Sequence, residues 1–594
     1  MSVEQRVAEV VPRPEYPRPQ MVRGEWLNLN GEWEFEIDHG NSGKDRGLMQ
    51  ADRLEGRIIV PFCPESRLSG VHHKDFMTSV WYRRTVEIPD HWGGGCVLLH
   101  FGAVDYEAEI WVNGRSAGTH RGGYTSFSFD ITSLLRVGAN VITVHARDDT
   151  RSRRQPKGKQ SIRYHSFECE YTRTTGIWQT VWLERVPQRY ISDFRVIPDP
   201  GNACVHLEAE CRGIGSAARL LSVEAYFDGK QVGSGQVVVT GQMARMTLHL
   251  TEAHLWEPGN PALYDLKLRL SGDGEEADEI DSYFGLRTVT WDDTVIRVNG
   301  APVFQRLVLD QGYYPDGVYT APTDDELRRD IELAMEMGFN GARAHQKVFE
   351  ARYLYWADRL GFLVWGEHAH TGLSIADATG VEVFLPEWME AMKRDFNSPA
   401  LVGWCPFNET EPWNNPERQD EEVLRIVYRV SKMFDPTRPV IDTSGYIHVV
   451  TDIYDIHDYE QDPDAFRRKF APMITGGEVH ETHPNRQKYG GQPYFVSEYG
   501  GIWWNPGQQS DDKGWGYGNR PQSEEEFLIR YEGLTKVLLE HPRICGFCYT
   551  QLYDIEQEVN GLYTFERKAK FDPARIRAVN RTRAAIEEPM VESD

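Results

Sequence analysis

The sequence feature that most restricts the fold is a repeated alternation of helical and strand-like segments after about residue 288. One unit begins at Thr323-Asp-Asp-Glu326, which has the pattern of a capping box. Apolar residues at helical spacing follow up to Gly338, where the helix should end, and a short apolar segment comes next at 341–343. This unit is typical of a helix that leads into a buried strand.

The same order recurs along the rest of the chain. Further helices are predicted at 353–360, 387–396, 421–434 and 524–539. Strands are predicted at 303–309, 341–343, 362–365, 401–407, 440–441, 453–456, 494–496 and 544–549. Eight strands that alternate with helices predict a (β/α)8 barrel, a fold that places its chemistry at the carboxyl ends of the strands.

The first half of the chain instead contains short segments in which apolar and polar residues alternate, such as 81–88 and 141–146. Between two such segments, Asn113-Gly114 supplies the positive φ angles of a tight hairpin. The pattern repeats on a smaller scale from about 189 to 287. We therefore expect an antiparallel β-sandwich, then an immunoglobulin-like sandwich, and then the barrel, with domains at 1–187, 188–287 and 288–594.

Charge and cysteine content exclude several classes of function. The formal net charge of −25 disfavours binding to nucleic acid or to anionic membranes, because those need clustered Lys and Arg. Residues 1–25 lack an apolar signal region, and no segment has the apolar length of a membrane span, so we expect a cytoplasmic protein. The eight cysteines are scattered, which favours reduced thiols, and Cys545-Gly-Phe-Cys548 is interpreted as part of a buried strand.

Polar residues end or directly follow most of the predicted barrel strands. They are Asp310, Arg343, His345, Glu367, His368, Asn408, Glu409, Asp442, His457, Tyr459, Glu498 and Gln551. Any one of them could be a loop residue or a helix cap, but their convergence on one barrel mouth favours catalysis. Glu409 and Glu498 lie at different strand ends and supply the proton donor and the ionised carboxylate that glycoside cleavage needs.

Other hydrolytic chemistries fit the sequence less well. Glu367-His-Ala-His370 could bring two imidazoles to a metal ion, but no His-Glu-x-x-His or paired-cysteine spacing occurs. The chain has neither the nucleophile elbow of serine hydrolases nor a Walker-type phosphate loop. We therefore expect a hydrolase that uses no metal ion and no organic cofactor.

Several motifs resemble those of glycoside hydrolase family 2, which includes β-galactosidases, β-glucuronidases and β-mannosidases. They are Leu29-Asn-Gly-Glu-Trp33, Trp111-Val-Asn-Gly114, Gly118-Thr-His-Arg-Gly-Gly-Tyr124, Gly176-Ile-Trp-Gln-Thr-Val-Trp182, Leu255-Trp-Glu-Pro258, Tyr283-Phe-Gly-Leu-Arg287, Trp404-Cys-Pro-Phe-Asn-Glu409 and Phe495-Val-Ser-Glu-Tyr-Gly-Gly501. The resemblance covers nearly the whole chain. It implies a jelly-roll first domain, an immunoglobulin-like second domain and a catalytic (β/α)8 barrel.

The resemblance also implies roles for individual residues. Glu409 matches the family's acid/base, and Glu498 matches its nucleophile. Asn408 matches the residue that bonds the sugar 2-hydroxyl. Arg343 matches the arginine that bonds the nucleophile, and Tyr459 matches the tyrosine that steadies it. These assignments describe a retaining β-glycosidase, which forms a covalent glycosyl-enzyme.

Further substrate contacts are expected from looser matches. Glu170 stands where many members carry an acidic residue on a loop that reaches the sugar, and a plain surface carboxylate is an equal alternative. His345 stands near Arg343 in sequence, and Trp504 could stack on a sugar or pack in the core. His457, Gln551 and Asp310 are included as strand-end residues.

The motifs indicate the identity of the terminal sugar less clearly than they indicate the catalytic residues. The β-glucuronidases resembled carry Asn-x-Lys before Gly-Ile-Phe-Thr, where the Lys pairs with the sugar carboxylate, and this chain has Glu558-Val-Asn560 before Gly561. We therefore expect an exo-acting enzyme on neutral sugars, most similar to β-galactosidases. A β-glucuronide, a pentopyranoside, a galactofuranoside and a non-catalytic carbohydrate-binding protein remain alternatives. Family members often form dimers or tetramers, so a homo-oligomer is also expected.

Overall fold

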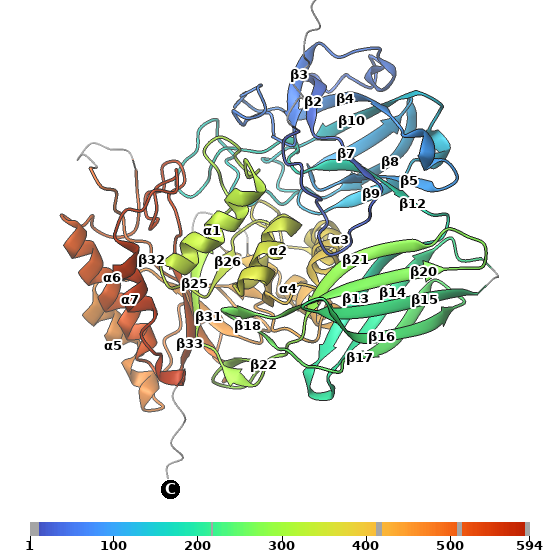
Figure 1. Cartoon of the computed structure of the whole chain (residues 1–594). Coiled ribbons are helices and arrows are strands. Elements are labelled where there is room, and N and C mark those ends of the chain that lie inside the picture. Colours follow the sequence, from blue (N-terminus) through green and yellow to red (C-terminus); the bar gives the residue numbers. More distant parts are fainter. Residues whose placement is uncertain (1–10, 216–217, 412–417, 508–513, 588–594) are drawn as a thin grey trace, which may run out of the picture.

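The computed structural model describes residues 11–215, 218–411, 418–507 and 514–587. They form two β-sandwiches, blue and green in Figure 1, that pack beside a barrel coloured from yellow-green to red. The expected fold class is confirmed, with a jelly-roll-like sandwich, an immunoglobulin-like sandwich and a carboxyl-terminal barrel of parallel strands. In the described part of the chain, no helix is both long and apolar enough to cross a membrane.

The first sandwich has a six-stranded sheet, β3-β2-β4-β10-β7-β8, that packs on a four-stranded sheet, β1-β12-β5-β9. Its strands are β1 Trp26–Asn28, β2 Gly31–Ile37, β3 Gly56–Val60, β4 Ser79–Glu87, β5 Cys96–Phe101, β6 Val104–Asp105, β7 Glu107–Val112, β8 Arg115–Arg121, β9 Phe127–Asp130, β10 Ala139–Arg147, β11 Gly176–Ile177 and β12 Val181–Val186. Alternating residues such as Trp33 and Phe35 fill the space between the sheets. Asn113 and Gly114 have positive φ angles and close the β7–β8 hairpin, as predicted.

The second sandwich packs the sheet β13-β14-β17 on the sheet β16-β15-β20-β21. Its strands are β13 Tyr190–Asp199, β14 Cys204–Arg212, β15 Arg219–Phe227, β16 Lys230–Val239, β17 Met243–His249, β18 Trp256–Glu257, β19 Asn260–Pro261, β20 Leu263–Ser271 and β21 Asp278–Gly285. Inward residues such as Leu207, Leu221 and Leu266 are buried, while the outward residues between them are more exposed. The expected boundaries after residues 187 and 287 fall in the short connections β12–β13 and β21–β22.

The barrel sheet follows a small sheet, β22-β23-β24, formed by Val289–Trp291, Ile296–Val298 and Ala301–Pro302. Seven parallel strands run in the order β28-β27-β26-β25-β33-β32-β31. These strands are β25 Gln305–Asp310, β26 Gly341–Ala344, β27 Leu363–Glu367, β28 Leu401–Cys405, β31 Tyr454–Asp458, β32 Tyr494–Gly500 and β33 Ile544–Thr550. They coincide with seven of the eight predicted strands.

The remaining strand position is held by residues 440–444. Val440 bridges to Trp404 in parallel, and β30 (Thr443–Ser444) pairs with β29 (Phe407–Asn408). On the other side, the Ser444 hydroxyl donates to Asp455 of β31 over 2.6 Å. The eighth predicted strand is therefore present, although it is short and its link to β31 runs through a side chain.

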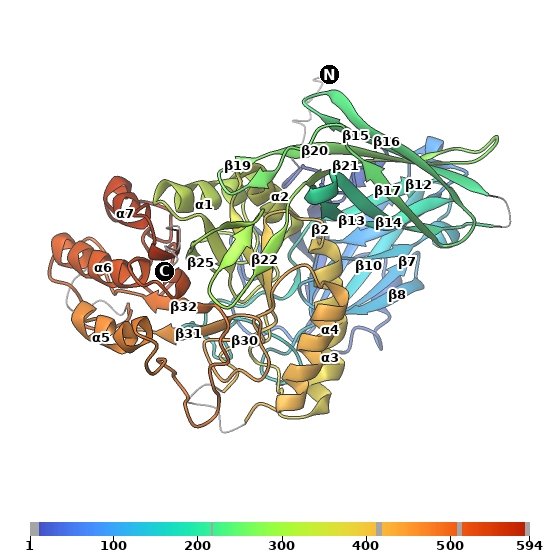
Figure 2. The same cartoon turned by 90° about the horizontal axis from the view of Figure 1, so that it is seen from below.

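Seven α-helices in the described residues surround the barrel sheet, and Figure 2 shows α3 and α4 side by side. They are α1 Asp324–Glu336, α2 Ala351–Leu360, α3 Ala378–Asp395, α4 Glu421–Phe434, α5 Pro463–Ile474, α6 Glu524–Leu539 and α7 Pro573–Asn580. Gly361 caps α2 in the left-handed conformation, directly after the end of the predicted helix 353–360. The expected capping box at α1 is wrong, because the Thr323 side chain makes no capping hydrogen bond.

Two other helix predictions also need correction. The helix expected from residue 387 begins nine residues earlier, at Ala378, because Asp377 caps it and Pro386 is accommodated inside it. Helices α5 and α7 were not expected, and both begin with Pro at a first-turn position after an Asp cap. Asp462 and Asp572 are those caps, so a start signal was present in the sequence.

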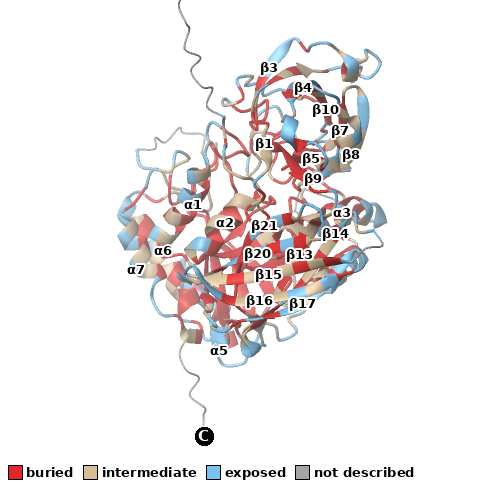
Figure 3. Cartoon of the chain, turned by 45° about the vertical axis from the view of Figure 1, so that its right-hand side comes forward, coloured by how far each residue is buried: buried red, intermediate tan, exposed pale blue. Residues whose placement is uncertain are grey.

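Buried residues, red in Figure 3, fill the barrel and the interiors of both sandwiches. Polar contacts also join the domains: the amide of Tyr124 in the first domain donates to Glu387 of α3 over 2.7 Å. The Trp256 indole of the second domain donates to the carbonyl of Asp358 in α2 over 2.8 Å. Cys545 and Cys548 are buried free thiols in β33, as predicted.

Candidate active site

Glu498 reaches the barrel mouth through an irregularity in its own strand. The pairing of β32 with both neighbouring strands shifts by one residue around Ser497. Such a β-bulge changes the direction of the side chains beside it. The Ser497 hydroxyl donates to the buried Asp455, which fixes the bulge. The Glu498 carboxylate thereby meets Arg343 of β26 and Tyr459, which directly follows β31.

Arg343 connects three of the strand-end residues. Its guanidinium donates to Glu498 over 3.0 Å, to Glu367 over 2.5 Å and to the Asn408 side-chain oxygen over 2.8 Å. It also donates to the carbonyl of Ser497 over 2.9 Å. A planar guanidinium fits this role because its donors point in fixed directions. Arg343 therefore sets the relative positions of side chains from four strands.

The Glu498 carboxylate is held at both oxygens. Arg343 donates to Oε1, and the Tyr459 hydroxyl donates to Oε2 over 2.5 Å. The Tyr459 ring stacks on Tyr517, with ring centroids 3.5 Å apart. His345 lies 4.0 Å from Oε1 through Nε2, while its Nδ1 meets Glu367 at 2.8 Å. These contacts orient the carboxylate and leave it little rotational freedom.

Glu409 follows directly after β29 and adopts a positive φ of 48°, which is uncommon for a residue with a side chain. Its amide donates to the carbonyl of Ser444, and its Oε1 meets His457 Nδ1 at 2.8 Å. The same His457 nitrogen lies 3.4 Å from Glu498. The facing atoms of Glu409, His457 and Glu498 all lie within 4.8 Å of one another. The two glutamates thus face a common centre.

Burial and neighbouring charges set the protonation of this group. Burial opposes the charge on His457, but the carboxylates of Glu498 and Glu409 outweigh it and raise the pKa of the imidazole. Burial would raise the pKa of Glu409, yet the hydrogen bond and charge of His457 lower it. Arg343 keeps its proton because Glu367 and Glu498 raise its pKa in spite of burial. Of these two partners, the imidazole is therefore the one favoured to carry the proton.

The first domain contributes a loop to the barrel mouth. The amides of Lys157 and Gly158 donate to carbonyls in the loop 369–371 over 2.8 and 2.9 Å. At the other end, the Tyr171 hydroxyl donates to Glu558. Lys159 lies between these anchors, and its pKa is raised by Cys169, Glu409 and Glu498 against the effect of burial. Among the described residues, its ammonium group has no hydrogen bond or ion pair.

Four other residues expected at the site are occupied elsewhere. Asp310 is buried and accepts hydrogen bonds from the hydroxyls of Tyr353 and Tyr553 at 3.2 and 2.5 Å. Gln551 bonds to the side chains of Gln311 and Asn560 at 2.6 and 2.9 Å.

Glu170 pairs with Lys157 at 2.8 Å, so its carboxylate is not directed at the two glutamates. Trp504 packs, half-buried, against the barrel core, and its indole N–H has no partner in the described residues. Among the described residues, no hydrogen bond or ion pair joins these four side chains to Glu409 or Glu498.

Two features could in principle hold a metal ion near the mouth. Glu409, His457 and Glu498 have the ligand types, but the Arg343 charge beside Glu498 opposes a cation there. His368 and His370 do not converge, because His368 meets Glu387 at 3.3 Å and His370 accepts the Asn408 amide at 3.2 Å. The geometry fits proton transfer and nucleophilic attack better than metal catalysis.

Sequence reasoning missed three members of this site. Glu367 was noted only as a strand end, yet it joins Arg343 to His345. Tyr517 and Lys159 come from loops far from the strand ends and reach the site through packing. The position of Glu367 at the end of a strand was a usable signal, whereas loop residues carry no periodic pattern that could identify them.

Models of one family match all three parts of the chain. "Glycosyl hydrolases family 2, sugar binding domain" matches residues 27–187, "Glycosyl hydrolases family 2" matches 189–287, and "Glycosyl hydrolases family 2, TIM barrel domain" matches 320–517. Among curated proteins, a β-glucuronidase of Paenibacillus borealis is 24% identical over 82% of this chain and 84% of its own length. A β-galactosidase of Thermoanaerobacter pseudethanolicus is 25% identical over 80% of this chain and 61% of its own length.

Solved structures show the same arrangement of domains. A β-glucuronidase of Lactobacillus rhamnosus superposes with a TM-score of 0.79 at 20% identity, covering 97% of this chain and 100% of that protein. A β-glucuronidase from Ruminococcus gnavus in complex with D-glucuronic acid superposes with a TM-score of 0.78 at 18% identity, covering 96% and 100%. Because three family models together match most of the chain, in the order in which its domains fold, this protein belongs to glycosyl hydrolase family 2.

Proposed function

We propose that this β-glycosidase releases one terminal sugar with retention of configuration, with Glu498 as the nucleophile and Glu409 as the acid/base. The observation that carries the proposal is the spacing of the two carboxylates, whose facing oxygens lie within 4.8 Å. Retaining enzymes hold their two carboxyl groups about 5 to 5.5 Å apart, whereas inverting enzymes need about 6.5 to 9.5 Å to admit a water molecule. The short spacing supports retention.

In the first step, an oxygen of Glu498 attacks the anomeric carbon while the glycosidic C–O bond breaks. Arg343 and Tyr459 support this role because they stabilise the ionised carboxylate and keep it oriented. The leaving oxygen takes a proton from Glu409. In the second step, water attacks the same carbon, Glu409 accepts its proton, and the Glu498 ester bond breaks to release the sugar.

The proton for Glu409 is available from its neighbour. The raised pKa of His457 favours the proton of the pair on the imidazole, which lies 2.8 Å from the Glu409 carboxylate. Transfer to Glu409, as charge develops on the leaving oxygen, returns His457 to its neutral form. His457 thus acts as a positioning residue that holds one proton on the pair, from which Glu409 delivers it.

Asn408 offers a contact for a sugar hydroxyl. Arg343 holds its side-chain oxygen, which turns the NH2 group away from that contact. This nitrogen is buried and has no partner among the described residues. A buried donor without a partner costs free energy, and a sugar oxygen would supply the missing acceptor. The arrangement supports a role for Asn408 at the 2-hydroxyl of the bound sugar.

For the substrate, we propose a neutral terminal sugar of the β-galactoside type. Glu558 and Asn560 stand where the β-glucuronidases resembled carry the Asn and Lys of their Asn-x-Lys motif. Asn560 donates to Glu558 over 2.9 Å and accepts from Gln551 over 2.9 Å. This network of amides and a carboxyl group fits hydroxyl groups and provides no positive charge for a uronate.

A β-glucuronide is the second candidate, and Lys159 favours it. Its ammonium has no partner among the described residues and senses the charges of Glu409 and Glu498, so it could pair with a sugar carboxylate. Several of the similar proteins are β-glucuronidases. Aryl β-galactosides and β-glucuronides should be compared with wild type and Lys159→Met. If the uronate is the substrate, only its kcat/KM should fall, by about tenfold or more.

The mechanism is tested by Glu498→Gly. This change removes the attacking group and leaves Glu409 and the sugar contacts in place, so turnover should nearly vanish. Azide should enter the space of the lost carboxylate and restore turnover of an activated aryl glycoside. The product should be the α-glycosyl azide, because one displacement inverts the anomeric centre. Product configuration is read by NMR.

Circular dichroism shows whether the Glu498→Gly variant is folded. A folded variant with wild-type activity would assign the nucleophile to another residue. The β-glycosyl azide as the only product would have the same consequence, because it requires a double displacement that this variant lacks.

A further inference from the structure

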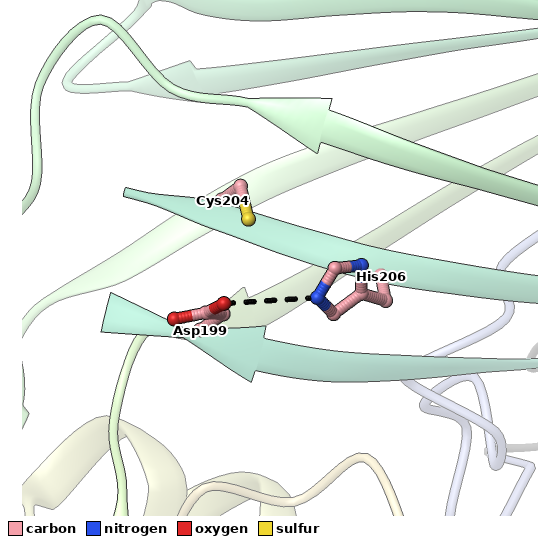
Figure 4. Close-up of side chains that lie close together, drawn as sticks. All are labelled: Asp199, Cys204 and His206. Carbon is pink, nitrogen blue, oxygen red and sulfur yellow. Dashed lines mark ion pairs between the residues drawn. The ribbon is translucent and has the colours of Figure 1, made fainter. Parts of the chain in front are cut away.

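A group of three possible metal ligands lies on the second sandwich, away from the barrel mouth. Asp199 ends β13, and Cys204 begins β14 after the short 3-10 turn Pro200–Asn202. His206 is two residues further along β14 and therefore on the same face as Cys204. Figure 4 shows the three side chains gathered on this face of the sheet.

The strand register brings these residues together without relying on flexible loops. Asp199 pairs directly with Cys204 across β13 and β14, and Cys204 pairs with His249 of β17. Paired residues of neighbouring strands point to the same face and lie about 4.5–5.5 Å apart at Cβ. Asp199, Cys204 and His249 thus form one row across three strands, with His206 in the next row.

The distances suit a small tetrahedral ion. Asp199 Oδ2 lies 3.7 Å from His206 Nε2, and the ligand atoms of Asp199, Cys204 and His206 are all within 4.8 Å of one another. Bonds of about 2.0–2.3 Å to a tetrahedral ion place its ligand atoms about 3.3–3.8 Å apart. Side-chain rotations alone can therefore close the site.

Hydrogen bonds already orient two of the ligands. His206 Nδ1 meets the Thr247 hydroxyl at 3.0 Å, which leaves Nε2 turned toward Asp199. The Asp199 carboxylate accepts from the side chain of Asn202 over 2.8 Å. Metal-binding histidines usually hold their second ring nitrogen in this way, which fixes the ring orientation. Both contacts exist before any ion binds.

We infer that Asp199, Cys204 and His206 form a binding site for one divalent transition-metal ion, with Zn²⁺ as the first candidate. A thiolate and an imidazole select such an ion over Mg²⁺ or Ca²⁺, which prefer oxygen ligands only. The fourth position faces solvent, where water or the exposed imidazole of His249 can enter. This site was not expected from the sequence, because the spacing of its residues matches no metal-binding motif.

Binding requires the loss of one proton. The metal–sulfur bond forms as the thiol proton leaves to the buffer, so affinity should rise with pH. The bound ion would tie β13 to β14 next to their connecting turn and so stabilise the sandwich.

The test is a titration of the chelator-treated full chain with Co²⁺, followed by absorption spectroscopy. One equivalent should produce the charge-transfer band of a cobalt–thiolate bond and the visible bands of a tetrahedral ion, and Zn²⁺ should remove both. Cys204→Ser should abolish the thiolate band. His206→Gln should weaken binding by about tenfold or more. Glycosidase activity should be unchanged in both variants, because the site is remote from the barrel mouth.

Two control variants separate this site from other thiols and acids. Cys96→Ser changes a partly exposed cysteine of the first domain and should leave the titration unchanged. Glu498→Gln alters the acidic group at the barrel mouth and should also leave it unchanged.

A thiolate band that survives Cys204→Ser, or no band in the wild type, would overturn the inference. Loss of binding only in Glu498→Gln would place the ion in the barrel instead. If Cys204→Ser fails to fold, the exposed position of His206 keeps His206→Gln as an independent measurement.

Discussion

The barrel mouth and the outer faces of the second sandwich both pair arginine with carboxylates, but the pairs are buried at the mouth and exposed on the sandwich. In the sandwich, Arg269 and Glu279 pair across two strands at 3.0 Å, and their side chains are 54% and 71% exposed. At the mouth, Arg343 is 2% exposed and meets Glu367, Glu498 and Asn408 together. An exposed pair is screened by water, whereas a buried charge must find every partner within the protein.

This difference shows where the protein accepts a cost in stability. Burying Arg343 with two carboxylates is expensive, and apolar residues of similar volume would often be as stable or more stable. The outer faces of the sandwich show that this chain can keep charged pairs such as Arg269–Glu279 at the surface. The buried charges at the mouth are therefore best explained by the reaction, which needs one carboxylate ionised and the other supplied with a proton.

The largest expected effect is the loss of activity when a carboxylate is removed at the mouth, compared with the removal of a carboxylate on the sandwich. Glu409→Ala should slow alkyl glycosides by about 10²–10⁴-fold, because a basic leaving oxygen needs a proton. Dinitrophenyl glycosides should lose far less, because their leaving group departs as an anion. The control, Glu208→Ala, removes a carboxylate paired with Arg245 on the sandwich and should change neither rate. Equal losses on both substrates would remove Glu409 from the acid role.

A second comparison makes the same substitution in both regions. Arg343→Met leaves Glu367 and Glu498 buried without their cation, which should lower the free energy of unfolding by about 3–5 kcal/mol. Arg269→Met breaks only an exposed pair and should cost about 0–1 kcal/mol. Denaturant unfolding of the two variants measures the difference. Similar costs would mean that the mouth is more hydrated than its burial indicates.

The two regions also differ in how well the sequence predicts them. In the second sandwich, alternation along β15 and β20 identifies both the strand and its buried face, because one face meets solvent. Barrel strands such as β28 and β33 are buried on both faces, so their residues show no alternation. They were predicted as short apolar segments: five directly follow a predicted helix, and 303–309, 453–456 and 494–496 were added on their apolar residues alone.

The site residues that could be predicted from the sequence are those at or near the ends of barrel strands. Arg343 and Glu498 lie near the ends of β26 and β32, Glu409 and Tyr459 directly follow β29 and β31, and the structure brings them together. Asp310 also ends a strand, yet tyrosine hydroxyls bind its carboxylate away from the centre. Side-chain direction at a strand end depends on bulges and neighbours, as the shift at Ser497 shows, and single-sequence patterns do not contain that information.

The loop residues of the site could not be predicted from the sequence for a related reason. Lys159 reaches the mouth because the first domain packs on the barrel through backbone hydrogen bonds at residues 157 and 158. Such docking depends on the shapes of two folded domains. The Asp199–Cys204–His206 group likewise follows from the β13–β14 register, which a sequence motif of fixed spacing does not describe.

The smallest expected effect concerns the pH dependence of the mouth. In the wild type, Glu409 and His457 share one proton, and Glu498 and Glu409 raise the pKa of the imidazole above its usual value of 6.5 in spite of burial. The pair therefore keeps its proton until the pH passes that raised value. Above it, no proton is left for the leaving oxygen, so kcat/KM should fall on the basic side only at pH values above about 6.5.

His457→Gln removes the imidazole and leaves the proton on Glu409 alone. A carboxyl group without a neighbouring imidazolium loses its proton at lower pH than an imidazole does, so the basic limb should move down by about one to three pH units. His254→Gln changes a half-exposed histidine that pairs with Glu252 at 3.3 Å on the sandwich, and its profile should match the wild type. The measurement is kcat/KM for an alkyl glycoside across the pH range. A basic limb that stays in place in His457→Gln would show that His457 does not hold the proton that Glu409 delivers. It would also show that the electrostatics of the barrel mouth and of the second sandwich differ less than the burial of their charged residues implies.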